Sequence, residues 1–273
     1  MKTSIEAKIR EDISTWLSRT PYPNFHSAIE ERVTGQENLG YITAIVHNYL
    51  TCVSEERPMN CNTILAAPSG CGKTETYRAL RDYFGREIPE LPVYIYDASQ
   101  ITATGFKGSE PSDILAPFFR KGMEKAIGIC FLDEIDKKLS PSYTSEGTNT
   151  NAEAQNNLLT IVEGEEVHDR LNHVVNTGNV MFVGLGSFSA FRDLREEDSG
   201  HLGFFAEAEK RKQAQEASHY SEITKKDMIT AGGSYELIGR FPYVVNYHSL
   251  DRESILKVIS LLSETWPPGS AAA

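Results

Sequence analysis

The sequence predicts an α/β fold of three layers, in which a parallel sheet is covered by helices on both faces. Strand candidates alternate along the chain with helical or loop segments, and that alternation is typical of parallel strands joined by crossover helices. One candidate, Ile127–Leu132, is apolar throughout, as expected of a strand that is buried on both faces. The strand candidates are 62–67, 92–98, 127–132, 179–185 and 243–247.

The N-terminal residues 1–32 are predicted to form an amphipathic helix followed by a linker. Apolar side chains recur there at helical spacing, and Pro21 and Pro23 end the pattern. We expect this helix to pack on its own domain, while docking of a partner is the alternative. The apolar positions are Ile5, Ile9, Ile13, Trp16 and Leu17.

Further segments complete the expected secondary structure. Helices are predicted over about 36–53 and 251–264, and the charged stretch 206–228 has a helical composition. The segment 140–156 is rich in Ser, Thr, Asn, Gly and Glu, and this composition indicates a mobile loop.

A phosphate-binding loop is predicted directly after the first strand candidate. Gly70 and Gly72 allow the backbone to turn sharply and to direct several N–H groups at a polyphosphate. A helix pattern begins at Lys73, whose ammonium group can reach the β- and γ-phosphates, and the Thr74 hydroxyl can ligate magnesium. Ala67 stands where the usual motif opens with glycine. The predicted nucleotide contacts in this loop are Pro68, Ser69, Gly70, Cys71, Gly72, Lys73 and Thr74.

A pair of acidic residues follows the buried strand candidate 127–132. Carboxylates at the end of a buried strand are unfavourable unless something there favours negative charge, and open α/β sheets bind their ligands at this edge. Asp133 is expected to hold Mg²⁺ together with Thr74, and Glu134 to orient and polarise the attacking water. The two motifs together predict a P-loop NTPase that hydrolyses ATP, with Lys73, Asp133 and Glu134 in catalytic roles.

The composition argues against nucleic-acid and membrane partners. The 273 residues include 27 basic and 38 acidic side chains, a net charge of −11. No apolar stretch approaches the roughly 20 residues that span a bilayer, and no signal-peptide pattern is recognised. Cys52, Cys61, Cys71 and Cys130 show no metal-ligand spacing. A cytoplasmic protein with reduced thiols is therefore expected.

Beyond these motifs, the sequence from about Val33 to Leu262 resembles the large ATPase domain of the ClpX and HslU protein unfoldases, in the AAA+ superfamily. Five segments carry the resemblance. They are the segment beside the adenine (33–36), the second strand with the first pore loop (97–108), the Asp-Glu strand (128–137), the helix after the second pore loop (156–164) and the arginine-finger segment (234–242).

The resemblance implies a protein that binds ATP and Mg²⁺, acts on protein substrates, and forms a hexameric ring when the small domain is present. Val33 would lie beside the adenine. Arg240 would project into the neighbouring subunit's site and stabilise the charge developing on the γ-phosphate, while a surface salt bridge is the alternative role. Phe106 would press on a threaded polypeptide, and the pore loop would consist of Gly105, Phe106, Lys107 and Gly108.

The sequence also departs from the ClpX pattern. No cysteine-rich zinc module precedes the ATPase domain and no loop motif for a protease is recognised, so a protease partner is not supported. The strand candidate near 180–186 ends without the polar residue that many AAA+ proteins use as first sensor, and Ser187 is the nearest candidate. Residues 33–265 are predicted to form the large domain and 266–273 a linker or cloning remnant, with the family's small C-terminal helical domain missing.

Two other functions stay open at this point. A regulatory or scaffold AAA+ protein would bind ATP and recruit a partner without threading it. A nucleic-acid-associated AAA+ machine is disfavoured by the acidic balance and by the lack of a basic patch. The glycines that flank Phe106 favour the unfoldase.

Overall fold

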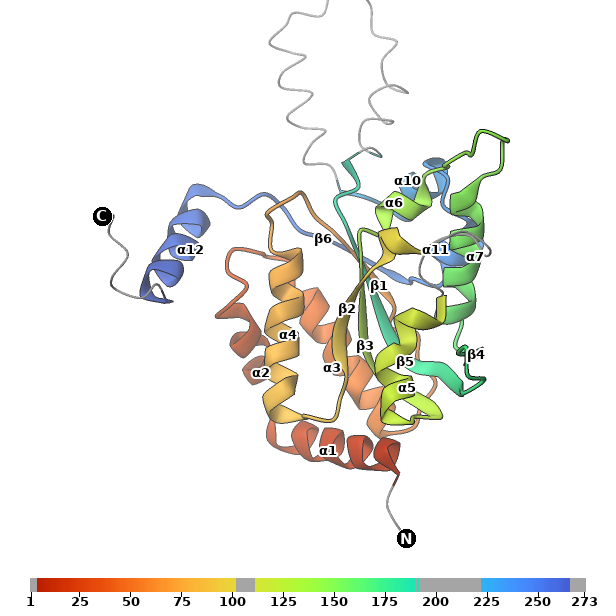
Figure 1. The fold of residues 1–273 in the computed structure, drawn as a ribbon. Coiled ribbons are helices and arrows are strands. Elements are labelled where there is room, and N and C mark those ends of the chain that lie inside the picture. The colour runs from red at the N-terminus through yellow and green to blue at the C-terminus, as the bar shows by residue number, and fades with distance from the viewer. Residues whose placement is uncertain (1–3, 102–110, 190, 192–221, 266–273) are drawn as a thin grey trace, which may run out of the picture.

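The computed structural model describes residues 4–101, 111–189, 191 and 222–265, and within them a six-stranded sheet forms the centre of the molecule (Figure 1). Its strands are β1 (Thr63–Ala66), β2 (Val93–Asp97), β3 (Lys125–Asp133), β4 (Glu166–His168), β5 (Val174–Gly186) and β6 (Tyr243–Asn246). They are ordered β2-β3-β5-β1-β6, and neighbours along this path run parallel. β4 pairs antiparallel with the start of β5. The structure therefore confirms the predicted parallel α/β sheet.

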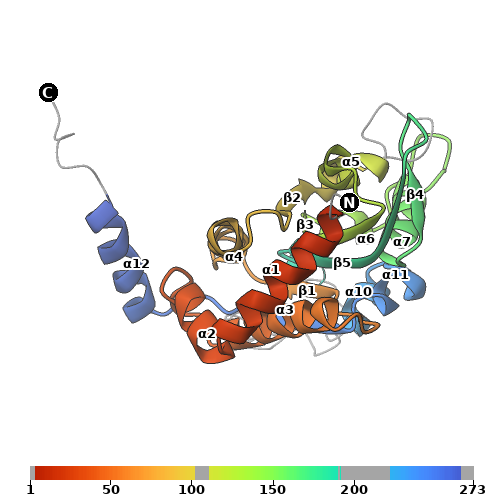
Figure 2. The ribbon, with the colours of Figure 1, turned by 90° about the horizontal axis from the view of Figure 1, so that it is seen from below.

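Helices lie on both faces of the sheet and give the three predicted layers (Figure 2). They are α1 (Ile5–Arg19), α2 (Tyr22–Glu30), α3 (Leu39–Ser54), α4 (Lys73–Glu87), α5 (Ala116–Lys121), α6 (Asp136–Leu139), α7 (Thr150–Val162), α10 (Lys225–Thr230), α11 (Tyr235–Gly239) and α12 (Arg252–Thr265), with 3₁₀ turns at Ala98–Gln100 and Pro111–Leu115. α4 contacts β2 on one face, and α7 contacts β5 on the other. In both views α12 lies apart from the sheet, beyond α2 and α4.

Each of the five strand candidates lies on a strand of the sheet, although the bounds differ. β3 is buried along all but its first and last residues, as its uninterrupted apolar run indicated. β5 begins at Val174, earlier than predicted, because its first residues pair with β4. The sequence pattern does not reveal β4, since the strand has three residues and only Val167 among them is buried.

The N-terminal helix packs on its own domain, as predicted. Ile9, Ile13 and Trp16 are fully buried, and α1 packs against α3. The Trp16 indole N–H donates to the Tyr83 hydroxyl at 3.2 Å. Its ring also meets Phe25 edge-on, with 5.3 Å between the ring centres. Because a buried tryptophan fills a large volume, α1 is an integral part of the core.

Replacing Trp16 with alanine is expected to destabilise the fold by about 3–5 kcal/mol, since the cavity left behind cannot fully collapse. Urea unfolding followed by far-ultraviolet circular dichroism measures this change without relying on the lost indole. Tyr41→Ala is the control, because that side chain is 65% exposed and its loss should change stability by no more than about 0.5 kcal/mol. Equal midpoints for the two variants would contradict a structural role for α1.

Two helices begin where the sequence analysis expects linker or loop. α2 carries Pro23 in its first turn, where the missing N–H is tolerated, so this proline starts a helix. α7 begins at Thr150, inside the predicted loop 140–156, because the Asn149 side chain caps its first turn. The prediction of a loop is therefore wrong for residues 150–156.

The C-terminal part of the chain agrees with the expected helices where it is described. α12 confirms the helix predicted over 251–264. The charged stretch 206–228 lies mostly outside the described residues, and its end forms the start of α10. The domain limits at residues 33 and 265 stay a prediction, and the tail 266–273 lies outside the described residues. Among the described helices, none is long and apolar enough to cross a membrane.

Candidate active site

The predicted phosphate loop follows β1, an inner strand that pairs with β5 on one side and β6 on the other. Gly70 and Gly72 have φ values of +80° and +88°, a left-handed conformation that glycine adopts without strain. Gly72 is also the N-cap of α4, so the loop ends at the N-terminus of that helix. The Ala67 N–H still donates to the Gly186 carbonyl at 3.1 Å. Alanine fits this position because it continues the sheet and the turn begins after it.

Lys73 and Thr74 form the first turn of α4. The Lys73 ammonium donates to the carbonyls of Ala67 at 2.5 Å and Pro68 at 2.9 Å, so it lies across the loop. Thr74 is exposed. Both side chains therefore lie at the carboxyl edge of the sheet, where the sequence analysis expects a polyphosphate.

Asp133 ends β3 at the same edge, and Asp97 of β2 is its partner in the sheet register. Burial raises the pKa of the Asp133 carboxyl, and the nearby charges of Glu134 and Asp97 act in the same direction. The backbone N–H of Glu134 and the charge of Lys73 oppose this shift. Because β3, β5 and β1 are parallel neighbours in the sheet, the fold brings the phosphate loop and the acidic end of β3 to the same edge, with β5 between them.

Glu134 lies in a left-handed conformation with φ of +56°, which is uncommon for a residue with a side chain. Its carboxylate pairs with the Lys137 ammonium at 2.6 Å, and the glutamate side chain is 44% exposed. The following residue, Ile135, donates its N–H to the Leu185 carbonyl at 3.0 Å. The turn after β3 is therefore bound to the end of β5.

Asp136 strengthens this connection. Its carboxylate accepts hydrogen bonds from the backbone N–H groups of Ser187 at 3.0 Å and Phe188 at 2.8 Å, and from the Ser187 hydroxyl at 3.2 Å. Ser187, the candidate first sensor, thus contacts the turn that carries Glu134. The role of Asp136 is not predicted from the sequence, although a third acid three residues after Asp133 is the available signal.

Val33, expected beside the adenine, is buried next to the phosphate loop. Its Cγ1 atom lies 3.8 Å from the place that a Cβ on Gly72 would occupy. A cavity of about 600 Å³ lies beside this segment. Its lining is mostly polar and includes Thr34, Gly35, Gln36, His248, Asp251 and Lys257.

Gln36 connects this cavity to the phosphate loop, a role that the sequence analysis missed. Its side-chain amide donates to the carbonyls of Cys71 at 3.1 Å and His248 at 2.8 Å. Its carbonyl oxygen accepts from the His248 N–H at 3.1 Å. Gln36 is 7% exposed, and its hydrogen bonds join the phosphate loop to the chain after β6.

Arg240, the candidate arginine finger, directly follows α11. Its guanidinium pairs with the Glu163 carboxylate at 2.5 Å, and the arginine side chain is 47% exposed. Within one subunit this arginine thus has the surface ion pair that the sequence analysis weighed as its alternative role. The proposed pore loop, residues 105–108, lies outside the described residues.

The four cysteines form no disulfide bonds in the described structure. Cys52, Cys61, Cys71 and Cys130 are buried free thiols. Burial raises the pKa of the Cys130 thiol to about 12, so it stays protonated at neutral pH. In the part of the chain that the structure describes, no three His, Cys, Asp or Glu side chains are grouped to hold a metal ion.

Comparisons with known proteins agree with these motifs. Residues 59–244 match the family model described as AAA domain (Cdc48 subfamily). The ATP-dependent Clp protease ATP-binding subunit ClpX of Treponema denticola is 26% identical over 258 residues, which cover 85% of this chain and 60% of that protein. The subunit of the same name from Azotobacter vinelandii is 27% identical over an alignment of 276 residues, which covers 89% of this chain and 61% of that protein. This chain therefore spans about 60% of the length of these relatives.

Proposed function

This chain belongs to the AAA domain family (Cdc48 subfamily), and on that premise we propose that it is the ATP-hydrolysing motor domain of a ClpX-like protein unfoldase or remodelling machine. It is an AAA+ ATP-binding domain related to ClpX. The observation that carries the proposal is the common sheet edge at which Lys73, Asp133 and Glu134 lie. Ring assembly and protein substrates are part of the proposal, because the chain spans only part of its relatives.

ATP would bind with its triphosphate in the loop 68–74 and its base at the cavity beside Val33. The loop N–H groups and the N-terminus of α4 favour a polyanion at this place. Lys73 would exchange its bonds to the Ala67 and Pro68 carbonyls for bonds to charged phosphate oxygens, which are stronger acceptors.

The donors at this edge fit Mg²⁺. Thr74 supplies a hydroxyl and Asp133 a carboxylate, and Mg²⁺ is usually held by one or two carboxylates together with substrate phosphates and waters. Burial raises the pKa of Asp133, and the negative charges of Glu134 and Asp97 add to this shift, so a cation there would stabilise its charged form. Bound Mg²⁺ would neutralise charge on the phosphates.

Hydrolysis would use Glu134 to orient and polarise the water that attacks the γ-phosphate. Its carboxylate is held by Lys137, and its turn is bound to β5 through Ile135 and Asp136. The contacts of Ile135 and Asp136 hold the turn that carries Glu134 against the end of β5, which lies beside β1. Fixed placement matters because most of the catalysis of phosphoryl transfer is positioning and charge stabilisation.

Arg240 would complete the site of a neighbouring subunit in a ring. To do so it would leave Glu163 and reach a γ-phosphate across the interface, where an arginine finger stabilises the developing charge. Protein substrates would be engaged by the loop 105–108. The chain offers no recognised segment for a protease partner, so we propose none.

The Arg240–Glu163 ion pair is also the observation that favours the second candidate function, a regulatory or scaffold AAA+ protein. If Arg240 stays bound within its own subunit, ATP would bind and change the shape of the domain without efficient hydrolysis. The two functions differ in whether turnover depends on contact between subunits.

ATP turnover per subunit, measured over a wide range of protein concentration, tests this proposal. An assembling motor is expected to turn over ATP faster per subunit as concentration rises, because each site needs an arginine from its neighbour. Sedimentation in the same buffers shows whether assembly follows the same curve. ATP binding with negligible turnover at every concentration would instead favour the scaffold.

A further inference from the structure

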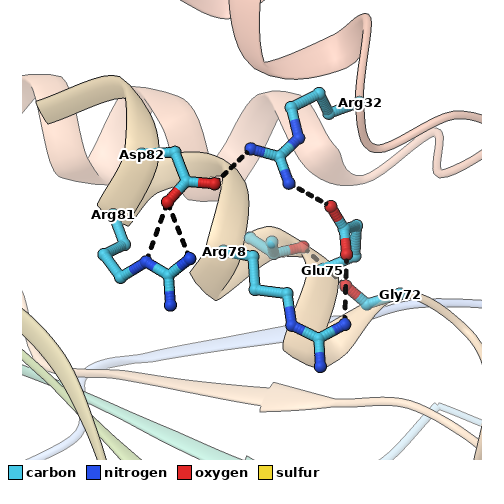
Figure 3. A network of polar contacts seen from close by, with 7 residues as sticks. Arg32, Gly72, Glu75, Arg78, Arg81 and Asp82 are labelled. Atoms are coloured by element: carbon cyan, nitrogen blue, oxygen red, sulfur yellow. Dashed lines mark hydrogen bonds and ion pairs between the residues drawn. The ribbon is translucent and has the colours of Figure 1, made fainter. Parts of the chain in front are cut away.

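Arg32, which follows α2, joins that part of the chain to α4 (Figure 3). Its guanidinium donates to the Glu75 carboxylate at 2.6 Å and to the Asp82 carboxylate at 2.7 Å. Glu75 and Asp82 are seven residues apart, which is about two helical turns, so they lie on one face of α4. A single side chain therefore holds two successive turns of the helix that begins at the phosphate loop.

The same two carboxylates also contact arginines of α4 itself. Arg78 pairs with Glu75 at 3.5 Å, and Arg81 pairs with Asp82 at 2.7 Å. The hydrogen bond to Asp82 raises the pKa of Arg32, and in turn the hydrogen bond from Arg32 lowers the pKa of Asp82. In this network Arg32 is the cation that comes from outside α4.

The contact lies between two parts of the nucleotide site. Val33 is the next residue after Arg32 and packs beside Gly72, while Glu75 comes two residues after Lys73. Arg32 holds the base-side segment to α4 near the surface, and Gln36 holds the same segment to the loop in the interior. The Arg32 side chain is 38% exposed, so its ion pairs contribute little to overall stability.

We propose that Arg32 is a positioning residue for nucleotide binding, which sets the base-side segment against the phosphate loop through Glu75 and Asp82. This inference rests on the proposed function of the same site. Because Arg32 acts on the base side, its loss should weaken binding of a whole nucleotide. The phosphate loop keeps its own glycines, Lys73 and helix N-terminus, so binding of a bare phosphate chain should be unaffected.

The experiment compares ADP with inorganic pyrophosphate, which have the same number of phosphates, by calorimetry on the full chain with Mg²⁺. Arg32→Ala is expected to weaken ADP binding about fivefold at low salt and to leave pyrophosphate affinity unchanged. At about 1 M salt, where exposed ion pairs are screened, the ADP affinities of variant and wild type should converge. At saturating ATP, the kcat of the variant should equal that of wild type.

Arg78→Ala is the matched control, because it removes a cation from the same carboxylate without separating α2 from α4. It should bind ADP as wild type does, and Arg32→Lys should recover part of the affinity through one of the two ion pairs. Equal losses for ADP and pyrophosphate, or the same loss in Arg78→Ala, would overturn the inference. A wild-type chain that binds neither ligand would overturn the proposed function itself.

Discussion

Glu134→Gln is expected to lower ATP turnover by about 10²–10⁴-fold while leaving ATP affinity within about twofold of wild type. The amide keeps the size of the side chain but cannot take up a proton or polarise a water as a carboxylate does. Binding should persist because the phosphate loop and Lys73 are unchanged. Phosphate release at saturating ATP and titration with a fluorescent nucleotide measure the two quantities separately.

Lys137→Met is the control for this variant, because it removes the ion-pair partner of Glu134 but keeps the carboxylate. It should retain most of the turnover, which separates loss of the ion pair from loss of the carboxylate. Turnover of Glu134→Gln within about threefold of wild type would exclude Glu134 as the residue that activates water.

Arg240→Ala is expected to reduce turnover per subunit by about 10³–10⁵-fold in the assembled protein, with ATP binding preserved. The large effect follows from the role in the transition state, since an ion pair of a half-exposed arginine contributes little to folding. Glu163→Gln removes the same intramolecular pair while keeping the arginine. If that variant lost as much activity as Arg240→Ala, the ion pair and not the finger would explain the effect.

Mixing the two inactive variants tests whether the arginine acts between subunits. In a mixed assembly, a Glu134→Gln subunit still carries Arg240 and can complete the site of an Arg240→Ala neighbour, which still carries Glu134. Turnover is therefore expected to reappear on mixing. A mixture that stays as inactive as its components would mean that Arg240 acts within its own subunit or not at all.

Local patterns were sufficient to predict the sheet and the motifs at its edge. The apolar run of β3 and the glycines before Lys73 each encode their structure within about ten residues. The start of α7 was misjudged because Asn149 and its neighbours have the composition of a loop, while in the structure the asparagine caps a helix. Composition alone does not separate these two uses of asparagine.

Contacts between distant residues could not be predicted in the same way. Gln36 and His248 are 212 positions apart, and Asp136 and Ser187 are 51 apart. A single sequence contains no periodicity that links such pairs, and the pairing becomes visible only when β6 and β5 are placed beside β1. For the same reason Arg240 could be proposed as a finger from its motif, while its bond to Glu163 could not.

The hydrogen bonds of Gln36 have a thermodynamic consequence for the two segments that they join. The side-chain amide of Gln36 donates one hydrogen bond to the Cys71 carbonyl and another to the His248 carbonyl. A shift of either carbonyl therefore changes the free energy of the hydrogen bond to the other. If phosphate binding displaces Cys71, the position of the chain entering α12 must respond, and linkage requires the reverse effect to be equal in size. A contact with α12 that moved the His248 carbonyl would then alter nucleotide affinity, although it would lie outside the nucleotide site.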